Sequence, residues 1–312
     1  MITIGEVEKA IHRAGLSAVG ISKPALERKY LARYRIWIDQ NYNAGMSWTT
    51  REPELRANIL NRFPWVKSVV VVLDNYFKEI RLGANPMFAS YARGEDYHRV
   101  VTEKLLKTLT ELKAIDNTTT GKIFVDSGAI MEKAFAEQAG LGWIGKNGLL
   151  IGENIGSFCF IGVLLLNKQL PAARRVPGEC GKCEICIEKC PTGAIISPGL
   201  IDARKCISYL TVEKRGRFSK DEKKLLNNWL FGCDICQECC PYNQRWAKET
   251  EEVRYSSAQQ RYDCSLQKWD SIDKNDFMMM FRDTPVLRLK FSRFRRNIEA
   301  LGKNNKIGHK YE

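Results

Sequence analysis

The stretch CGKCEICIEKCP, residues 180–191, has the pattern C-x-x-C-x-x-C-x-x-x-C-P. Thiolates at this spacing bind three irons of a [4Fe–4S] cluster, and the last cysteine of the run ligates the other cluster in two-cluster ferredoxins. The pattern therefore predicts a second set of cysteines. That set is present in CDICQECCP, residues 233–241, which repeats C-x-x-C-x-x-x-C-P. The sequence thus predicts a ferredoxin-like module with two [4Fe–4S] clusters.

Two such clusters need eight thiolates. The repeat assigns the first cluster to Cys180, Cys183, Cys186 and Cys240. For the second cluster it assigns Cys190, Cys233 and Cys236, and the eighth ligand is Cys206 or Cys239. We prefer Cys206, because Cys240 precedes the proline of the repeat and adjacent side chains usually point apart. Cys159 and Cys264 are lone cysteines and are expected to be small buried hydrophobic residues.

Zinc and disulfides are the alternative uses of these cysteines. Structural zinc sites use pairs of C-x-x-C or mixed Cys/His sets, which explain a triple run poorly. Disulfides need an oxidising compartment, and residues 1–16 lack the apolar core of a signal peptide. The sequence therefore favours reduced, cluster-binding cysteines in a cytoplasmic protein.

Length and charge set further bounds. A chain of 312 residues is long enough for about two domains with a real core. No stretch approaches the ~18 apolar residues of a membrane span, so no membrane partner is expected. The net charge of +13 favours a polyanionic partner, with nucleic acid first, although scattered solvated lysines are the alternative.

The N-terminal part alternates helical and strand patterns. Helices are expected over residues 4–14, 98–112 and 129–139, and strands over 66–73, 122–125 and 158–166. This alternation predicts an α/β (α+β) domain over residues 1–170. A boundary near 171–178 would lead into the cluster module, residues 171–248. A basic, helical C-terminal segment would follow over 249–312, with Phe281, Phe291 and Phe294 among its arginines and lysines.

Three near matches to known motifs fail on context. Residues 140–145 satisfy G-x-G-x-x-G but follow a helix, and Asn147 stands where a P-loop needs Ser or Thr. Backbone amides there could still hold a polar cofactor edge. Asp96-Tyr-His98 begins like the D-x-H-x-x-G motif of proteins that ligate cobalamin through histidine, but Val101 replaces the glycine.

Together these pieces closely resemble the epoxyqueuosine reductases. The matching segments are GEDYH (94–98), VDSG (125–128), AGLGWIGKNGLLI (139–151), GSF (156–158), the cysteine runs, CISYLTVEKRG (206–216), FGCDICQECCPYN (231–243) and Arg296-Asn297. The resemblance covers about residues 1–300 and is to the short members, without C-terminal HEAT-like repeats. It implies reduction of epoxyqueuosine to queuosine at the tRNA wobble position, the last step of queuosine biosynthesis, with the chain acting as a monomer.

The resemblance also implies cofactors and site residues. It implies two [4Fe–4S] clusters with Cys206 as the eighth ligand, a base-off cob(II)alamin with no histidine below the cobalt, and an external low-potential electron donor. It places Asp126 as the proton donor and as a cofactor contact. Further positions near the corrin or the RNA are Arg56, Lys146, Asn147, Leu150, Ile161, Ser208 and Lys214.

Asp126 has two interpretations. As a proton donor it would need apolar burial to raise its pKa toward neutrality. As a structural residue it would cap the helix expected from about residue 129. For Tyr97 and His98 a role in the site and a structural role, as one face of a helix packed on the sheet, are equally good interpretations.

The expected partner is the tRNA anticodon stem-loop bearing epoxyqueuosine. Arg293, Arg295 and Arg296, with Lys214, Arg215 and Arg217, are candidates to hold its phosphates, and aromatic residues could stack on its bases. A corrinoid reductive dehalogenase and a ferredoxin-like electron carrier remain alternatives. Neither would need tRNA binding.

Overall fold

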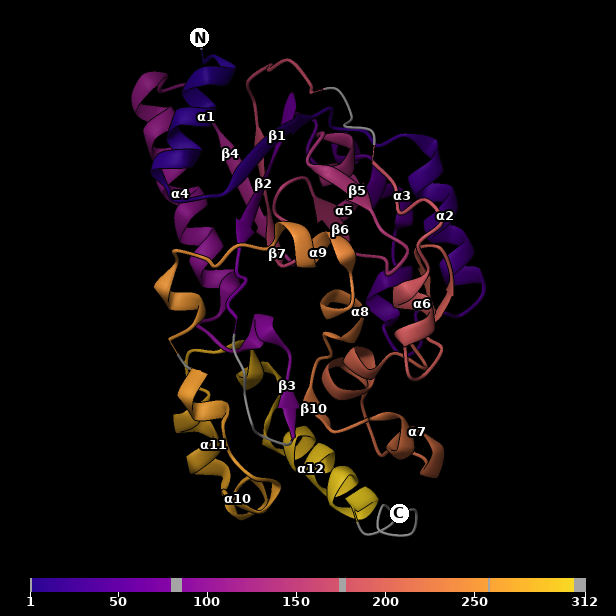
Figure 1. Cartoon of the computed structure of the whole chain (residues 1–312). Helices are drawn as coiled ribbons and strands as arrows, with labels where there is room; N and C mark the ends of the chain where they lie inside the picture. The colour runs from indigo at the N-terminus through magenta and orange to yellow at the C-terminus, as the bar shows by residue number, and fades with distance from the viewer. Residues whose placement is uncertain (1, 80–85, 174–177, 258, 306–312) are drawn as a thin grey trace.

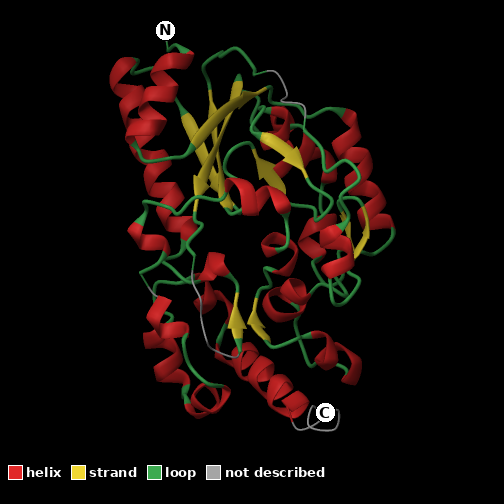
Figure 2. Cartoon of the chain, viewed as in Figure 1, coloured by secondary structure: helices red, strands yellow, loops and turns green. Residues whose placement is uncertain are grey.

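The computed structural model describes residues 2–79, 86–173, 178–257 and 259–305 (Figure 1). Its N-terminal part is built on a four-stranded sheet in the order β1-β2-β7-β4. The strands are β1 (Ala18–Ser22), β2 (Ser68–Asn75), β7 (Cys159–Leu166) and β4 (Gly121–Val125). Every neighbouring pair is antiparallel. In Figure 2 the sheet lies in one half of the molecule, and the other half is mostly helical.

The antiparallel sheet makes this domain α+β rather than α/β. Strands β2 and β4 both pair with β7 in the opposite direction, so they run parallel to each other without touching. In the chain, helix α4 (Tyr97–Ile115) comes between β2 and β4. In the sheet, β7, which comes later in the chain, lies between these two strands. Buried strands read as continuous apolar runs in either direction, so the sequence pattern gives their positions and not their orientation.

Helices cover both faces of the sheet. On one face α1 (Ile4–Arg13) packs against α4, and buried residues such as Val7, Ile11 and Val101 join the core there. A capping box between Thr3 and Glu6 starts α1. On the other face lies α5 (Glu132–Gln138), with Phe135 fully buried against the strands. The helices and strands expected at residues 4–14, 66–73, 98–112, 122–125 and 158–166 are thus confirmed, within a few residues.

The near match to G-x-G-x-x-G is a β-hairpin. Its strands are β5 (Gly142–Ile144) and β6 (Leu150–Gly152), which pair antiparallel. It follows a helix, residues 132–138, and not a strand, so the dinucleotide and P-loop interpretations fail as expected. Helices α2 (Arg28–Asp39) and α3 (Pro53–Ala57) lie on the same side of the molecule (Figure 1).

The cysteine module follows the sheet domain. It contains α6 (Ile185–Lys189), the hairpin of β8 (Ile195–Ser197) and β9 (Leu200–Ile201), α8 (Ile235–Glu238) and α9 (Pro241–Trp246). Helices α6 and α8, which lie within the two matching cysteine runs, pack against each other. The centre of the expected boundary, residues 174–177, lies outside the described residues.

The remaining elements form a second core at the C-terminal end. Strand β3 (Met87–Phe88) pairs in parallel with β10 (Trp229–Phe231), and around them lie α7 (Lys220–Leu225), α10 (Leu266–Ser271), α11 (Lys274–Met280) and α12 (Phe291–Asn305). A π-helical turn, η4, spans Tyr209–Glu213. Short 3₁₀ turns are η1 (Ser47–Thr50), η2 (Ile59–Asn61), η3 (Ser90–Ala92), η5 (Val253–Tyr255), η6 (Gln259–Tyr262) and η7 (Pro285–Leu289).

Two of the aromatic residues proposed to stack on RNA bases belong to this core. Phe281 and Phe294 are fully buried with Trp269 and Phe277, and the Phe281 and Phe294 rings are 5.4 Å apart. Buried apolar residues that alternate with arginines are the usual pattern of a helix with one face packed on a core. Within the described residues, no helix is both long and apolar enough to cross a membrane.

Candidate iron–sulfur and proton-donor site

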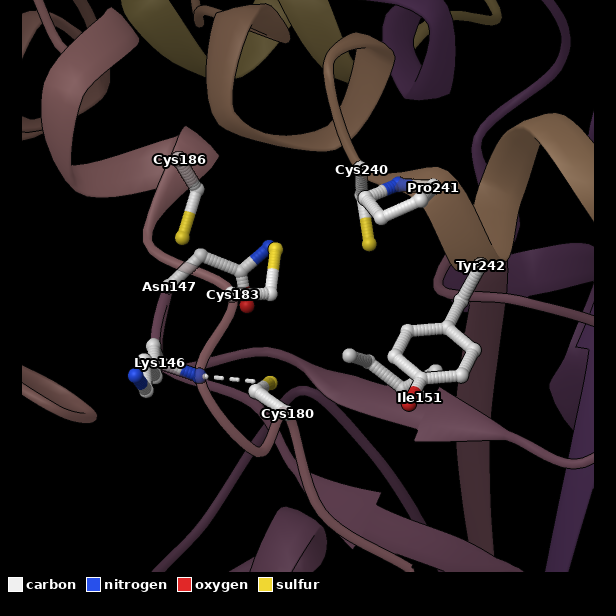
Figure 3. A pocket seen from close by; sticks show the side chains of 9 residues that line it. All are labelled: Lys146, Asn147, Ile151, Cys180, Cys183, Cys186, Cys240, Pro241 and Tyr242. Carbon is white, nitrogen blue, oxygen red and sulfur yellow. Dashed lines mark hydrogen bonds between the residues drawn. The ribbon is translucent and has the colours of Figure 1, made fainter.

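The first cysteine set faces one pocket. Cys180, Cys183, Cys186 and Cys240 line it together with Lys146, Asn147, Ile151, Pro241 and Tyr242 (Figure 3). The backbone N–H of Lys146 donates to the Cys180 sulfur at 3.4 Å. These are the four cysteines that the repeat assigns to one cluster, drawn from two runs about 50 residues apart in the chain.

The second set gathers beside the first. Burial raises the pKa of Cys206, and the charge of Cys190 acts in the same direction. Burial raises the pKa of Cys233 to about 12, with the charges of Asp234, Cys206 and Cys190 adding to it. Cys239 instead lies among the first set, where its charge helps to raise the pKa of Cys186. This arrangement supports Cys206 as the eighth ligand, which stays a prediction.

The donor set fits an iron–sulfur cluster better than a single ion. Zinc needs four ligands around one point at about 2.3 Å. Among the described residues, no three His, Cys, Asp or Glu side chains are close enough to share one metal ion. Buried thiols with raised pKa values ionise only when cations are bound, as cluster assembly supplies. Trp143 and Trp229, in the apolar groups that include Cys240 and Cys233, bury indole N–H groups with no partner among the described residues.

A buried polar network fastens the cysteine module to the sheet domain. Asn243 accepts a hydrogen bond from the Ser157 N–H at 2.6 Å and donates to the Ser157 hydroxyl at 2.9 Å. Gln237 donates to the Ser157 carbonyl at 3.0 Å. A Cβ at Gly156 would lie 2.3 Å from the Asn243 side-chain oxygen, so only glycine fits there. This network joins the GSF segment (156–158) to the end of the segment FGCDICQECCPYN (231–243).

Asp126 follows β4 in a left-handed conformation, with φ of +46°. Its carboxylate accepts a hydrogen bond from the Tyr97 hydroxyl, and His98 Nε2 lies 3.7 Å away. Helix α5 begins at Glu132 with Met131 as its N-cap, so the interpretation of Asp126 as the cap is wrong. The expected apolar burial is also wrong for the protein alone, because the Asp126 side chain is 64 % exposed.

Tyr97 and His98 begin α4 and lie at the site. The Tyr97 ring stacks on Phe160 at 4.2 Å, and burial raises its pKa, so its hydroxyl stays protonated and donates to Asp126. Asp96 caps α4 by accepting from the His98 N–H at 3.1 Å. The D-x-H near match is therefore a helix cap, and His98 also contacts Arg288 from the C-terminal segment.

Sequence reasoning missed Glu132 and Lys133, which follow the VDSG segment. The Asp126 N–H donates to Glu132 Oε1 at 2.8 Å, and Lys133 Nζ donates to the Gly148 carbonyl at 2.7 Å. The Lys133 side chain is exposed. Desolvation by the surrounding protein lowers the pKa of Lys133, and the charges of Asp126 and Cys236 oppose this shift. Lys133 therefore lies within electrostatic range of both Asp126 and Cys236 of the second cysteine set. The only available signal was their place in the first turn of an expected helix.

The other expected cofactor positions lie on several elements. Lys146 and Asn147 turn between β5 and β6 at the cysteines, where Asn147 donates to the Cys236 carbonyl at 3.1 Å. Leu150 is buried in β6, and Ile161 packs from β7 against the same core. Arg56 donates to the Trp48 carbonyl at 2.6 Å. Ser208 and Lys214 flank η4, and Lys214 pairs with Glu222 at 2.9 Å.

The arginines expected to clamp RNA phosphates are used inside the protein. Arg293 donates to the Val212 carbonyl at 2.7 Å, and Arg296 donates to the carbonyls of Lys214 and Gly216 at 2.7 and 2.8 Å. Asn297 donates to the Thr211 carbonyl at 2.9 Å, and Arg295 pairs with Asp270 at 3.1 Å. The end of a helical turn leaves carbonyls open, and α12 supplies their donors. The match at Arg296-Asn297 is thereby explained.

The cysteine module beside an acid-bearing edge of the sheet defines an iron–sulfur oxidoreductase. A family model described as a 4Fe-4S double cluster binding domain matches residues 179–243, in agreement with this geometry. A second model, described as Epoxyqueuosine reductase QueG, DUF1730, matches residues 56–127.

Relatives give the family. The chain is 36% identical over 294 residues to the epoxyqueuosine reductase of Leadbetterella byssophila, covering 94% of this chain and 96% of the relative. It is 35% identical over 301 residues to that of Escherichia coli, covering 92% of this chain and 78% of the relative. The chain belongs to the epoxyqueuosine reductases.

Solved structures share the fold. An epoxyqueuosine reductase bound to an epoxyqueuosine-modified tRNA stem loop has a TM-score of 0.87 at 24% identity, covering 95% of this chain and 80% of that one. The enzyme from Bacillus subtilis, with an aspartate-bearing catalytic loop swung out of its active site, has a TM-score of 0.83 at 24% identity, covering 97% and 85%.

Proposed function

We propose that this protein reduces epoxyqueuosine to queuosine at the wobble position of tRNA, as a cytoplasmic monomer supplied with electrons by an external low-potential donor. The observation that carries the proposal is the nearness of Asp126 and the cysteine module, whose charges both act on Lys133, in a chain of this family. A dehalogenase or a simple electron carrier would require neither the tRNA nor this family membership.

The reaction removes the epoxide oxygen. Two electrons and two protons convert the epoxide to an alkene and water. No side chain supplies electrons at the required potential, so cofactors must. Bound cobalamin would supply the two-electron chemistry at the strained C–O bond, and two [4Fe–4S] clusters would relay single electrons to it.

Asp126 would give a proton to the oxygen released from carbon. It follows β4 in a left-handed conformation, and the Tyr97 hydroxyl from α4 donates to one of its carboxylate oxygens. The apolar surroundings that an acid needs near neutrality would come from the corrin and the substrate closing over this exposed carboxylate.

The cobalamin is expected in its base-off form. Of the three histidines, His12 lies in α1 and His98 is engaged by Asp96 and Arg288, while His309 lies outside the described residues. Lys133, near Asp126 and Cys236, and Asn147, at the cysteines, would help to hold the corrin. Arg56, Lys146, Leu150, Ile161, Ser208 and Lys214 remain proposed contacts of the corrin or the RNA.

The RNA contacts are reassigned from α12 to the segment it supports. Arg215 and Arg217 are exposed just beyond η4, and Arg282 and Lys290 are exposed in the C-terminal segment. Exposed guanidinium and ammonium groups can bind phosphates, which fixes position rather than sequence. Arg293 and Arg296 would then act indirectly, by holding residues 210–216 in place.

Reconstitution tests the function. Protein loaded anaerobically with iron, sulfide and cobalamin is incubated with a strong reductant and tRNA carrying epoxyqueuosine, and the digested nucleosides are identified by mass. Queuosine should form, and leaving out cobalamin or iron should stop it. A fully loaded, reducible protein that leaves epoxyqueuosine unchanged would overturn the proposal.

A further inference from the structure

Glu132 is a titratable residue to which the proposed reaction gives no role. It is the first residue of α5, and its Oε1 accepts the backbone N–H of Asp126 at 2.8 Å. The hydrogen bond spans six residues and closes the turn that leads from β4 to α5. The Glu132 carboxylate therefore contacts the backbone of Asp126 and not the Asp126 carboxylate.

Asp126 is thus held at two points. Tyr97 from α4 holds its carboxylate, and Glu132 from α5 holds its backbone. The second hold matters because φ of +46° is a region that residues other than glycine rarely adopt. Gly128 in the same turn has φ of +89°, and a Cβ there would lie 2.9 Å from the Phe124 ring. Releasing the backbone would let the turn relax and move the carboxylate.

The charge of Glu132 is also set by this site. Burial raises the pKa of Glu132 to about 8, and the negative charge of Asp126 acts in the same direction, while Lys133 opposes it. On the other side of Asp126, Tyr97 and His98 face it from α4, and the Met131 N–H donates to the backbone carbonyl of Arg56 in α3 at 3.4 Å. Near neutrality Glu132 is therefore mostly protonated.

We propose that Glu132 is a positioning residue for Asp126: it holds the Asp126 backbone in the left-handed turn, with the Asp126 carboxylate at the Tyr97 hydroxyl. The inference rests on the proposed function. Ionisation of Glu132 would place a second negative charge beside Asp126, which would oppose the negative charge that develops on the departing oxygen. Glu132 itself touches neither the substrate nor a cofactor in this role.

The first experiment separates position from charge. In the fully loaded protein, Glu132→Ala removes the acceptor, and kcat should fall by ~10- to 100-fold with KM for tRNA unchanged, since a small displacement of a reacting group has this effect. Glu132→Gln keeps an oxygen that can accept the Asp126 N–H, and should recover most of the loss. Glu8→Gln, an exposed residue of α1, is the matched control.

Iron content and melting temperature are measured for each variant, so that loss of turnover is separated from loss of structure. A Glu132→Ala protein that keeps wild-type kcat, or a Glu132→Gln protein as slow as Glu132→Ala, would overturn the positioning role. Failure of the proposed function is distinct, because the wild-type protein itself would then produce no queuosine.

The second experiment follows pH. Glu132 ionises as pH rises through about 8, whereas glutamine does not, so the ratio of Glu132→Gln to wild-type kcat should rise above that pH. The folded wild-type protein also keeps a proton that the unfolded chain releases near pH 4.5. Its melting temperature should therefore fall relative to Glu132→Gln between about pH 4.5 and about pH 8. A rate ratio and a temperature difference that both stay constant with pH would overturn the charge role.

Discussion

In the cysteine module, the residues that stand out in the sequence come together in space. In the C-terminal segment, two arginines that stand out in the sequence are engaged inside the protein. Cys180, Cys183, Cys186 and Cys240 line one pocket as the repeat predicts. Arg293 and Arg296, the residues that made the tail look like an RNA clamp, direct their donors to backbone carbonyls of residues 210–216.

The difference lies in what each pattern encodes. A cluster motif fixes its ligands by short spacing along the chain, so the local sequence almost determines the local geometry. The role of an arginine depends on what lies opposite it. For Arg296 that is a turn about 80 residues earlier in the chain, and its burial lowers its pKa to about 10. A run of basic residues is therefore weaker evidence of nucleic-acid binding than a cysteine run is of a cluster.

The largest expected effect tests the cysteine side of the comparison. Cys206→Ser should remove one cluster, leave about four of the eight irons per chain and abolish tRNA reduction, because the second cluster would lack a thiolate. Cys239→Ser should keep both clusters, because Cys180, Cys183, Cys186 and Cys240 already supply the four thiolates of the first cluster. Iron and sulfide analysis with electron paramagnetic resonance measures both. The opposite pattern would show that Cys239 is the eighth ligand.

Asp126→Asn should have the next largest effect. Turnover should fall by ~10²- to 10⁴-fold if Asp126 is a general acid, because the amide cannot donate the proton with the same ease. Iron content and cobalamin binding should stay unchanged. The structure has removed the capping explanation, so a variant with normal turnover would mean that another group, such as Tyr97, supplies the proton.

Arg296→Leu should act on stability. The half-buried guanidinium donates to three carbonyls between Leu210 and Gly216, and leaving them without donors should lower the free energy of unfolding by ~1–3 kcal/mol. Arg282→Leu, at an exposed position of the same segment, is the control and should change it little. Denaturant unfolding of the anaerobic protein measures this. Equal stabilities would return Arg296 to the RNA-binding surface.

The smallest effect is expected at Arg215 and Arg217. Replacing both with serine should leave stability within ~0.5 kcal/mol, because both side chains are exposed. It should weaken tRNA binding and reduce the log–log salt slope by roughly 0.7–0.9 for each lost phosphate contact. Binding titrations at several salt concentrations give the slope. An unchanged slope would move the RNA footprint toward Arg282 and Lys290.

The sequence predicted the elements near the site but not how they meet. The cysteine sets, the strands and the place of Asp126 after β4 follow from spacing and apolar runs. The antiparallel direction of the sheet does not, because buried runs carry no orientation. Glu132 could not be recognised either, since its contact with the Asp126 N–H depends on a left-handed turn that shifts the start of α5 by three residues.

The central claim is that this chain removes one oxygen from a modified nucleoside in tRNA with two electrons. The direct measurement is an anaerobic titration of the fully loaded protein and epoxyqueuosine tRNA with a known amount of reductant, followed by the mass of the wobble nucleoside. We predict the loss of one oxygen atom for every two electrons consumed. Electrons that reduce the clusters while the nucleoside keeps its oxygen would contradict the account.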